Sequence, residues 1–169
     1  ISLVHGDDFS SVGISRELKW LRRALEARFE ITTKVVGTGP GMVDEARLLN
    51  RVIRRTEEGW EYEADQRHAE LIIKGLGLEE SKAVATPAEG DRPWLAEEDE
   101  EKLGSREARE FRGLAARANY PAQDRIDIQY AVKEACRGMA EPTKRDVRML
   151  RRLGRYLKGR PRLVVEHKW

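Results

Sequence analysis

Short apolar runs separated by turn residues dominate the first part of the chain. Residues 1–4 and 9–12 are apolar or rich in β-forming residues, and they flank the sequence His-Gly-Asp-Asp, which favours a tight turn. Residues 48–56 and 60–64 flank Glu-Glu-Gly in the same manner. We therefore predict two β-hairpins that together form a small antiparallel sheet.

Apolar residues that recur every three to four positions predict helices. Leu18, Leu21 and Leu25 share one face of a helix that begins at Ser15, which is a suitable N-cap. The same spacing predicts further helices after Asp65 and over residues 105–120, 127–139 and 143–158.

Local signals complete the predicted order of elements. Thr143 is a suitable N-cap, and Asp146 three positions later can complete a capping box at the start of the last helix. Residues 29–36 and 163–166 are rich in β-branched residues and predict two more strands. The predicted fold class is α+β: a small antiparallel sheet of two β-hairpins with packed helices, followed by a helical C-terminal part.

Charge is distributed unevenly along the chain. Residues 89–110 carry nine acidic and four basic side chains, whereas residues 142–169 carry ten basic and two acidic ones. We therefore predict three parts: residues 1–88, an acidic linker over residues 89–104, and a helical part over residues 105–169. A basic end of this kind indicates a polyanionic partner.

The composition excludes several classes of protein. The 169 residues include one cysteine, Cys136, so there is no disulfide framework and no cysteine-based zinc site. No apolar run approaches the ~20 residues that a membrane-spanning helix needs, and we expect no signal peptide. We therefore expect an intracellular protein, cytoplasmic or nuclear, with no membrane partner. Both ends are strand-like, and we expect the sequence to be a segment of a longer protein.

Asp7 and Asp8, in the first predicted turn, are the candidate catalytic and metal-binding residues. Mg²⁺ prefers oxygen ligands, one or two of them carboxylates, and polymerases join nucleotides between two such ions. Strands would hold these acids while the turn leaves them open to solvent and substrate. A polar turn without a catalytic role is the ordinary alternative. Phosphoryl transfer of this kind also normally requires a further carboxylate from another strand.

The last predicted helix carries a stripe of cations that we call the basic stripe. Its members are spaced three or four positions apart along one side of the helix: Lys144, Arg148, Arg151, Arg155 and Lys158. Such a stripe can contact nucleic-acid phosphates, with steep dependence on salt. The alternative is a solvated face opposite the apolar residues Val147, Leu150, Leu153 and Leu157.

Several short motifs occur in a fixed order from about Leu3 to Lys158. They include "VHGDDF", a charged helix that ends in "FEI", a helix that begins near "DQRH", the extended "KAVATP", "DIQYAV" at residues 127–132 and "RYLKG" at residues 155–159. This order resembles that of copia-type retrotransposon reverse transcriptases, which show a Tyr-x-Asp-Asp hairpin, a helix ending in Phe, a Q-x-x-Y helix and a Ser-Thr-Pro stop. Of these motifs in the chain, "DIQYAV" and "RYLKG" are the most specific.

The resemblance implies the C-terminal palm, thumb and connection portion of a Pol polyprotein. Asp7 would correspond to the metal-binding Asp of the hairpin and Asp8 to its neighbour, with Mg²⁺ as the cofactor of the complete enzyme. Residues 47–64 would be similar to the region that holds the primer end. The implied partners are an RNA/DNA template–primer duplex, a dNTP in the complete enzyme, and the remainder of the polyprotein, with an RNase H domain beyond Trp169.

Departures from the family pattern leave alternatives open. His5 stands in place of the Tyr, Gly6 in place of a residue such as Val, and Ile126 in place of a Pro. The upstream strand with its catalytic Asp is absent from the sequence, so we expect the segment to be inactive alone. The alternatives are a non-catalytic nucleic-acid-binding or structural fragment, and a decayed retroelement remnant.

Overall fold

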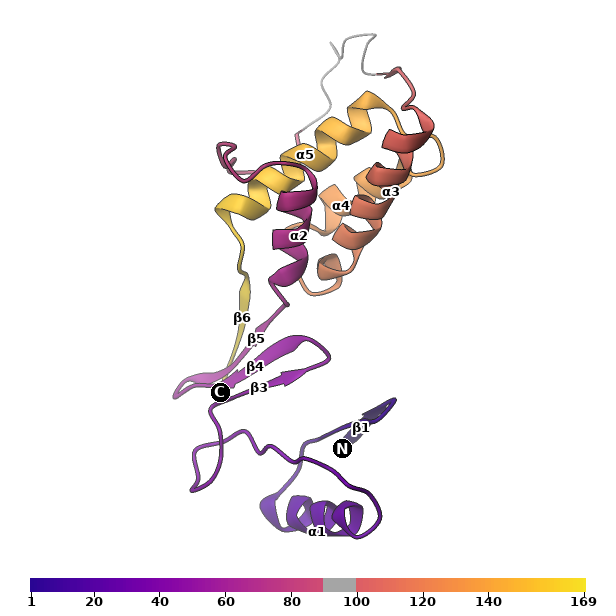
Figure 1. Cartoon of the computed structure of the whole chain (residues 1–169). Coiled ribbons are helices and arrows are strands. Elements are labelled where there is room, and N and C mark those ends of the chain that lie inside the picture. Colours follow the sequence, from indigo (N-terminus) through magenta and orange to yellow (C-terminus); the bar gives the residue numbers. More distant parts are fainter. Residues whose placement is uncertain (90–99) are drawn as a thin grey trace. The chain divides into compact units, whose positions relative to one another are not determined.

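The computed structural model describes residues 1–89 and 100–169, which form two compact units. The first unit consists of Ile1–Glu61 with Glu166–Trp169, and the second of Tyr62–Val165. The units are described separately below, with most of their helices and strands labelled in Figure 1. Most of the predicted acidic linker lies outside the described residues, so the predicted division into three parts stays a prediction.

The first unit begins with the predicted hairpin. Strands β1 (Ser2–His5) and β2 (Asp8–Ser11) pair antiparallel, with His5 opposite Asp8 and a two-residue turn between them. Gly6 in this turn has a φ of 58°, a left-handed conformation that glycine adopts without steric cost. The sequence signal for this hairpin is therefore confirmed, although the hairpin forms a sheet of its own.

Helix α1 (Ser15–Glu26) follows the hairpin, at the start that the sequence predicted. Its N-cap is Ile14 in an extended conformation, so Ser15 is the first helical residue and not the cap. Leu18, Leu21 and Leu25 are half-buried on one face, and no residue of the helix is fully buried. The next predicted strand, residues 29–36, is wrong: the segment is irregular apart from an isolated bridge from its last residue.

A four-stranded sheet contains the second predicted hairpin. Its order is β3-β4-β5-β6, and its strands are β3 (Glu45–Leu48), β4 (Arg51–Arg55), β5 (Gly59–Glu63) and β6 (Val164–Lys168). The predicted strand over residues 48–56 is divided, because Leu49 and Asn50 have φ values of 49° and 64° and form a tight turn. Two separate small antiparallel sheets therefore replace the single predicted sheet.

The second unit is mainly helical, as the sequence predicted. It comprises α2 (Arg67–Gly75), α3 (Ser105–Asn119), a short 3₁₀ helix (Pro121–Gln123), α4 (Gln129–Arg137) and α5 (Lys144–Gly159). The helices meet through a core of buried apolar side chains that includes Ile72, Phe111, Ala115, Ile128, Val132, Leu150, Leu153 and Leu157. The α+β class with a helical C-terminal part is thus confirmed.

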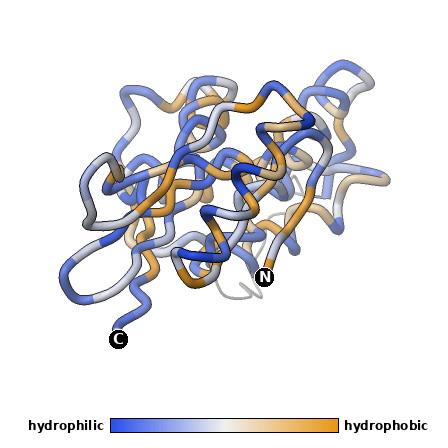
Figure 2. Tube along the Cα trace, turned by 90° about the horizontal axis from the view of Figure 1, so that it is seen from below, coloured by the Kyte–Doolittle hydropathy of each residue, from blue (hydrophilic) through white to orange (hydrophobic). Residues whose placement is uncertain are grey.

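Two local predictions can be followed in detail. The backbone N–H of Thr143 donates to the Asp146 carboxylate at 2.8 Å, and the backbone N–H of Asp146 donates to the Thr143 hydroxyl, which confirms the capping box of α5. Figure 2 shows hydrophobic stretches interrupted at short intervals by hydrophilic residues. Among the described residues, no helix is both long enough and apolar enough to span a membrane.

Candidate functional site

The structure places both candidate acids at the tip of the β1–β2 hairpin. Asp7 lies in the turn and Asp8 is the first residue of β2, and both side chains are exposed. Within residues 1–89 and 100–169, neither carboxylate takes part in a hydrogen bond or an ion pair. Their oxygens are therefore open to a cation from solution.

The hairpin holds this tip through contacts away from the turn. The Ser2 and Ser11 hydroxyls are hydrogen-bonded at 2.8 Å across the strands, and the N-terminal amine donates to the Val12 carbonyl at 2.8 Å. The ring of Phe9 lies 6.3 Å from that of Phe29, centroid to centroid. These contacts fix the strand register and thereby the position of the two acids.

The donor set at the tip suits magnesium only as part of a larger site. Mg²⁺ usually takes one or two carboxylates and completes its shell with water and substrate phosphates. Asp7 and Asp8 supply those two carboxylates. Over the described part of the chain, no group of three or more His, Cys, Asp or Glu side chains is arranged to hold a metal ion. The magnesium role of Asp7 and Asp8 therefore stays a prediction.

The basic stripe lies along α5, but three of its members donate hydrogen bonds to backbone carbonyls of residues 76–82 within the second unit. Arg151 donates to the Leu76 carbonyl at 2.9 Å, and Arg155 to the Lys82 carbonyl at 2.7 Å. Lys158 donates to two more carbonyls of the same segment, those of Glu79 and Ser81. These cations therefore donate to backbone carbonyls of the irregular segment that follows α2.

The two remaining members of the stripe also have partners. Lys144 forms an ion pair with Glu101, and Arg148 also has an interaction partner. The apolar residues of α5 face the core, as the alternative interpretation of a partly solvated helix requires. Nucleic-acid binding by the stripe stays a prediction, and the structure gives Arg151, Arg155 and Lys158 a second role in holding residues 76–82.

Two glycines of α5 allow that segment to lie close to the helix. A Cβ on Gly154 would lie 2.6 Å from Cδ1 of Leu78, and one on Gly159 would lie 2.8 Å from Cβ of Ala83. Leu78 is almost completely buried at this contact. The segment is therefore packed on α5 by apolar contacts as well as held by the cations.

Sequence reasoning missed a buried polar cluster beside the end of α5. Arg125 is 3% exposed, and its guanidinium donates two hydrogen bonds to Asp127, at 2.9 and 2.7 Å. It also donates to the carbonyls of Arg160 and Pro161, while the Tyr156 hydroxyl donates to Asp127 at 2.9 Å. We call this group the Arg125 clamp.

The charges of the clamp stabilise one another. Burial alone would raise the pKa of Asp127, but the hydrogen bonds from Arg125 and Tyr156 outweigh it and hold that pKa below its ordinary value. Burial and the Asp127 carboxylate together raise the pKa of the Tyr156 hydroxyl. The only local signal for the clamp in the sequence is the Arg-x-Asp spacing of residues 125 and 127, within the stretch that resembles the retroelement motif.

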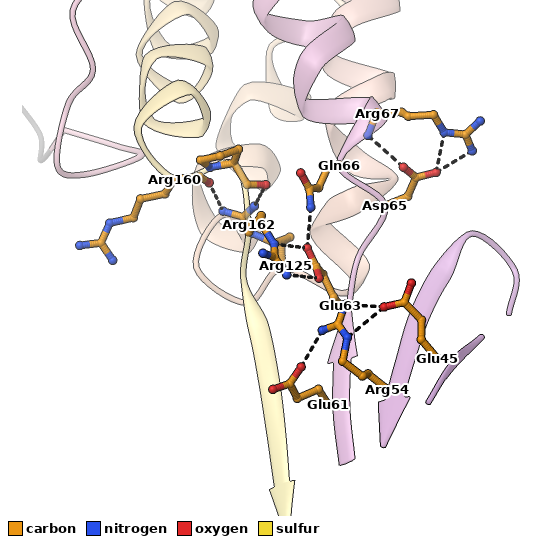
Figure 3. Close-up of polar contacts among 11 residues, drawn as sticks. Glu45, Arg54, Glu61, Glu63, Asp65, Gln66, Arg67, Arg125, Arg160 and Arg162 are labelled. Atoms are coloured by element: carbon orange, nitrogen blue, oxygen red, sulfur yellow. Dashed lines mark hydrogen bonds and ion pairs between the residues drawn. The ribbon is translucent and has the colours of Figure 1, made fainter. Parts of the chain in front are cut away.

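A second ion pair was also missed. Glu63 is 3% exposed and receives two hydrogen bonds from Arg162, each at 2.7 Å, and one from the Gln66 side chain at 2.7 Å. Figure 3 shows these residues converging on the Glu63 carboxylate. The pair connects the last residue of β5 to the segment just before β6. Its partners are 99 positions apart, so no local pattern could have revealed it.

Comparison with known proteins gives one partial match to a curated protein. The chain is 31% identical over 93 residues to the "Uncharacterized mitochondrial protein AtMg00810" of Arabidopsis thaliana. The match covers 55% of this chain and 37% of that protein. No family model matches the sequence, and no solved structure matches the fold.

Proposed function

We propose that the chain derives from a copia-type retroelement reverse transcriptase and that its β1–β2 hairpin contributes carboxylates to the polymerase metal site. One observation carries the proposal: Asp7 and Asp8 lie exposed and unpaired at the tip of an antiparallel hairpin, within the described residues. A retroelement-related origin is also supported by the order of the sequence motifs and by the partial match to the Arabidopsis thaliana protein.

The geometry of the turn supports a role next to nucleic acid. A Cβ placed on Gly6 would have no atom within 4 Å, so the space beside the turn is open. Asp7 would hold Mg²⁺ with Asp8 beside it, and a third carboxylate would come from another strand of the polymerase. Bound magnesium would supply charge stabilisation for the phosphoryl oxygens during nucleotidyl transfer. The protein's contribution is to hold both acids on a rigid hairpin.

The alternative is a non-catalytic nucleic-acid-binding fragment that uses the basic stripe of α5. In that case phosphates would compete with the carbonyls of residues 76–82 for Arg151, Arg155 and Lys158. The hairpin requires no such exchange, since its carboxylates have no partner within residues 1–89 and 100–169. The metal-site proposal is therefore the better supported of the two.

Manganese binding tests the proposal directly on the 169-residue chain. Paramagnetic Mn²⁺ should broaden the amide NMR signals of residues 6–9, and Asp7→Asn with Asp8→Asn should abolish the broadening. In a polypeptide that also carries the rest of the polymerase, Asp7→Asn should eliminate DNA synthesis without loss of folding.

A matched control is available in the second hairpin. Glu57 and Glu58 are also adjacent acids in an exposed turn, between β4 and β5. Unchanged broadening at residues 6–9 in the Asn variants would contradict the proposal. Equally strong broadening at Glu57 and Glu58 would show that any pair of turn acids binds the ion, and would also contradict it.

A further inference from the structure

Helix α1 presents two opposite faces. Leu18, Leu21 and Leu25 are half-buried on one of them. With 3.6 residues per turn, the opposite side carries a group spaced three and four positions apart within an arc of roughly 100°. Its members, which we call the α1 stripe, are Arg16, Lys19, Trp20 and Arg23.

Trp20 follows Lys19 directly, lies at one edge of this arc beside the cations, and is 67% exposed. Arg16 forms an ion pair with its neighbour Glu17. Across the part of the chain that the structure describes, the Lys19 and Arg23 side chains have no hydrogen bond or ion pair. A single exposed apolar residue is ordinary, but an indole with two unpaired cations within one helical turn is a surface that can bind an anion and an aromatic ring together.

The placement of Trp20 relative to the leucines distinguishes a membrane surface from single-stranded nucleic acid as the partner of α1. A helix that lies on a membrane inserts its Trp and Leu side chains from one apolar face and keeps its cations on the other. In α1 the tryptophan instead lies beside the cations, opposite the leucines. Proteins that bind single-stranded nucleic acid combine cations along the backbone with aromatic rings on which bases stack. The α1 stripe has this second composition.

The position of unpaired cations also favours α1 over α5 as the helix that binds a polyanion. Arg151, Arg155 and Lys158 donate to backbone carbonyls of residues 76–82. The α1 stripe belongs to the same unit as the Asp7–Asp8 hairpin, whereas the basic stripe belongs to the other unit. An element of the hairpin's own unit is therefore available to hold a polyanion.

We propose that the α1 stripe binds single-stranded nucleic acid, with Trp20 stacking on a base and Arg16, Lys19 and Arg23 contacting phosphates. The choice of partner rests on the proposed function, since a polymerase site must hold an unpaired template strand. Three phosphate contacts to a single strand give a logarithmic salt slope of about −2, so raising salt from 50 to 200 mM should weaken binding about 20-fold.

Fluorescence anisotropy with a labelled oligothymidylate of 20 nucleotides tests the proposal. Lys19→Gln with Arg23→Gln should leave one phosphate contact and reduce the salt effect to about threefold. Trp20→Ala should weaken binding about tenfold with the salt slope unchanged, and Trp20→Phe should restore part of the loss. These side chains are exposed, and circular dichroism should show an unchanged helix content in each variant.

A second helix provides matched controls. Lys133 and Arg137 on α4 are likewise a Lys and an Arg four positions apart beside the 65% exposed Tyr130, but both form ion pairs with Glu134. Lys133→Gln with Arg137→Gln, and Tyr130→Ala, should leave the affinity unchanged. If they weaken binding as much as the α1 variants do, the interaction is a general charge effect and the proposal is wrong.

Two other probes separate the remaining outcomes. Equal affinity for polyglutamate, which has charges but no bases, would contradict base stacking. Binding of the α1 stripe to vesicles rich in phosphatidylserine, without binding to the oligonucleotide, would assign it to a membrane surface instead. All measurements are made in EDTA without divalent metal, so a negative result here leaves the manganese test of Asp7 and Asp8 unaffected, and the reverse also holds.

Discussion

Replacing Arg125 by Met should destabilise the helical unit strongly. The substitution removes four hydrogen bonds, two to Asp127 and two to the carbonyls of Arg160 and Pro161. It also leaves the Asp127 carboxylate, whose side chain is 19% exposed, without its cation. Removing one partner of a buried ion pair costs about 3–5 kcal/mol, and the partial exposure of Asp127 points to the lower end of that range.

Urea denaturation followed by circular dichroism measures this loss. With a slope of about 2 kcal/mol per molar urea, a loss of about 3 kcal/mol lowers the midpoint by about 1.5 M. Arg106→Met is the matched control, because the Arg106 side chain is 91% exposed in its ion pair with Glu110 and should contribute nothing measurable. The reasoning is refuted if Arg125→Met lowers the midpoint no more than this control does.

The pH dependence of stability tests the same clamp independently. The pKa of Asp127 is lower in the folded chain than its ordinary value, so its contribution is present above that ordinary value and is lost as pH falls through the folded pKa. Between pH 5 and pH 2 the wild-type chain should therefore lose more stability than Asp127→Asn. Equal losses would show that the carboxylate is not stabilised by Arg125.

The remaining predictions concern His68 and the glycines. Burial lowers the pKa of His68, with Arg117 and Arg67 adding to the effect and Asp65 opposing it, so acidification from pH 7.5 to 5.5 should lower the unfolding midpoint. His68→Gln should remove that dependence, whereas His5→Gln at an exposed position should not. Gly159→Ala should lower the melting temperature, because its Cβ would meet that of Ala83 at 2.8 Å. Gly113→Ala, which meets no atom within 4 Å, should raise it through better helix propensity.

Local patterns in the sequence were sufficient for most individual elements. Three- and four-residue spacing located the helices, since the core of the second unit is built from their apolar faces. The glycine and acids after His5 located the first hairpin. The strand over residues 48–56 was located, but its start was wrong: β4 begins only at Arg51, because Leu49 and Asn50 adopt left-handed backbone conformations, which are uncommon for Leu.

Long-range pairing could not be predicted in the same way. The position of β6 beside β5 depends on hydrogen bonds between residues about a hundred positions apart, and so does the ion pair of Glu63 with Arg162. Periodicity placed the basic stripe on one side of α5, but it contains no information about what lies against that side. The candidate acids were located correctly at a hairpin tip because a tight turn is a local property.

Backbone carbonyls of residues 76–82 accept hydrogen bonds from α5, and this makes substitutions easier in that segment than in the helix. Every residue type offers the same backbone oxygen, so the exposed positions 79 and 82 can exchange their side chains and still accept hydrogen bonds from Lys158 and Arg155. The helix cannot change as freely, because only a long cationic side chain spans the gap. Descendants of this sequence should therefore drift quickly at these exposed positions, while the buried Leu78 and the arginines and lysine of α5 are kept.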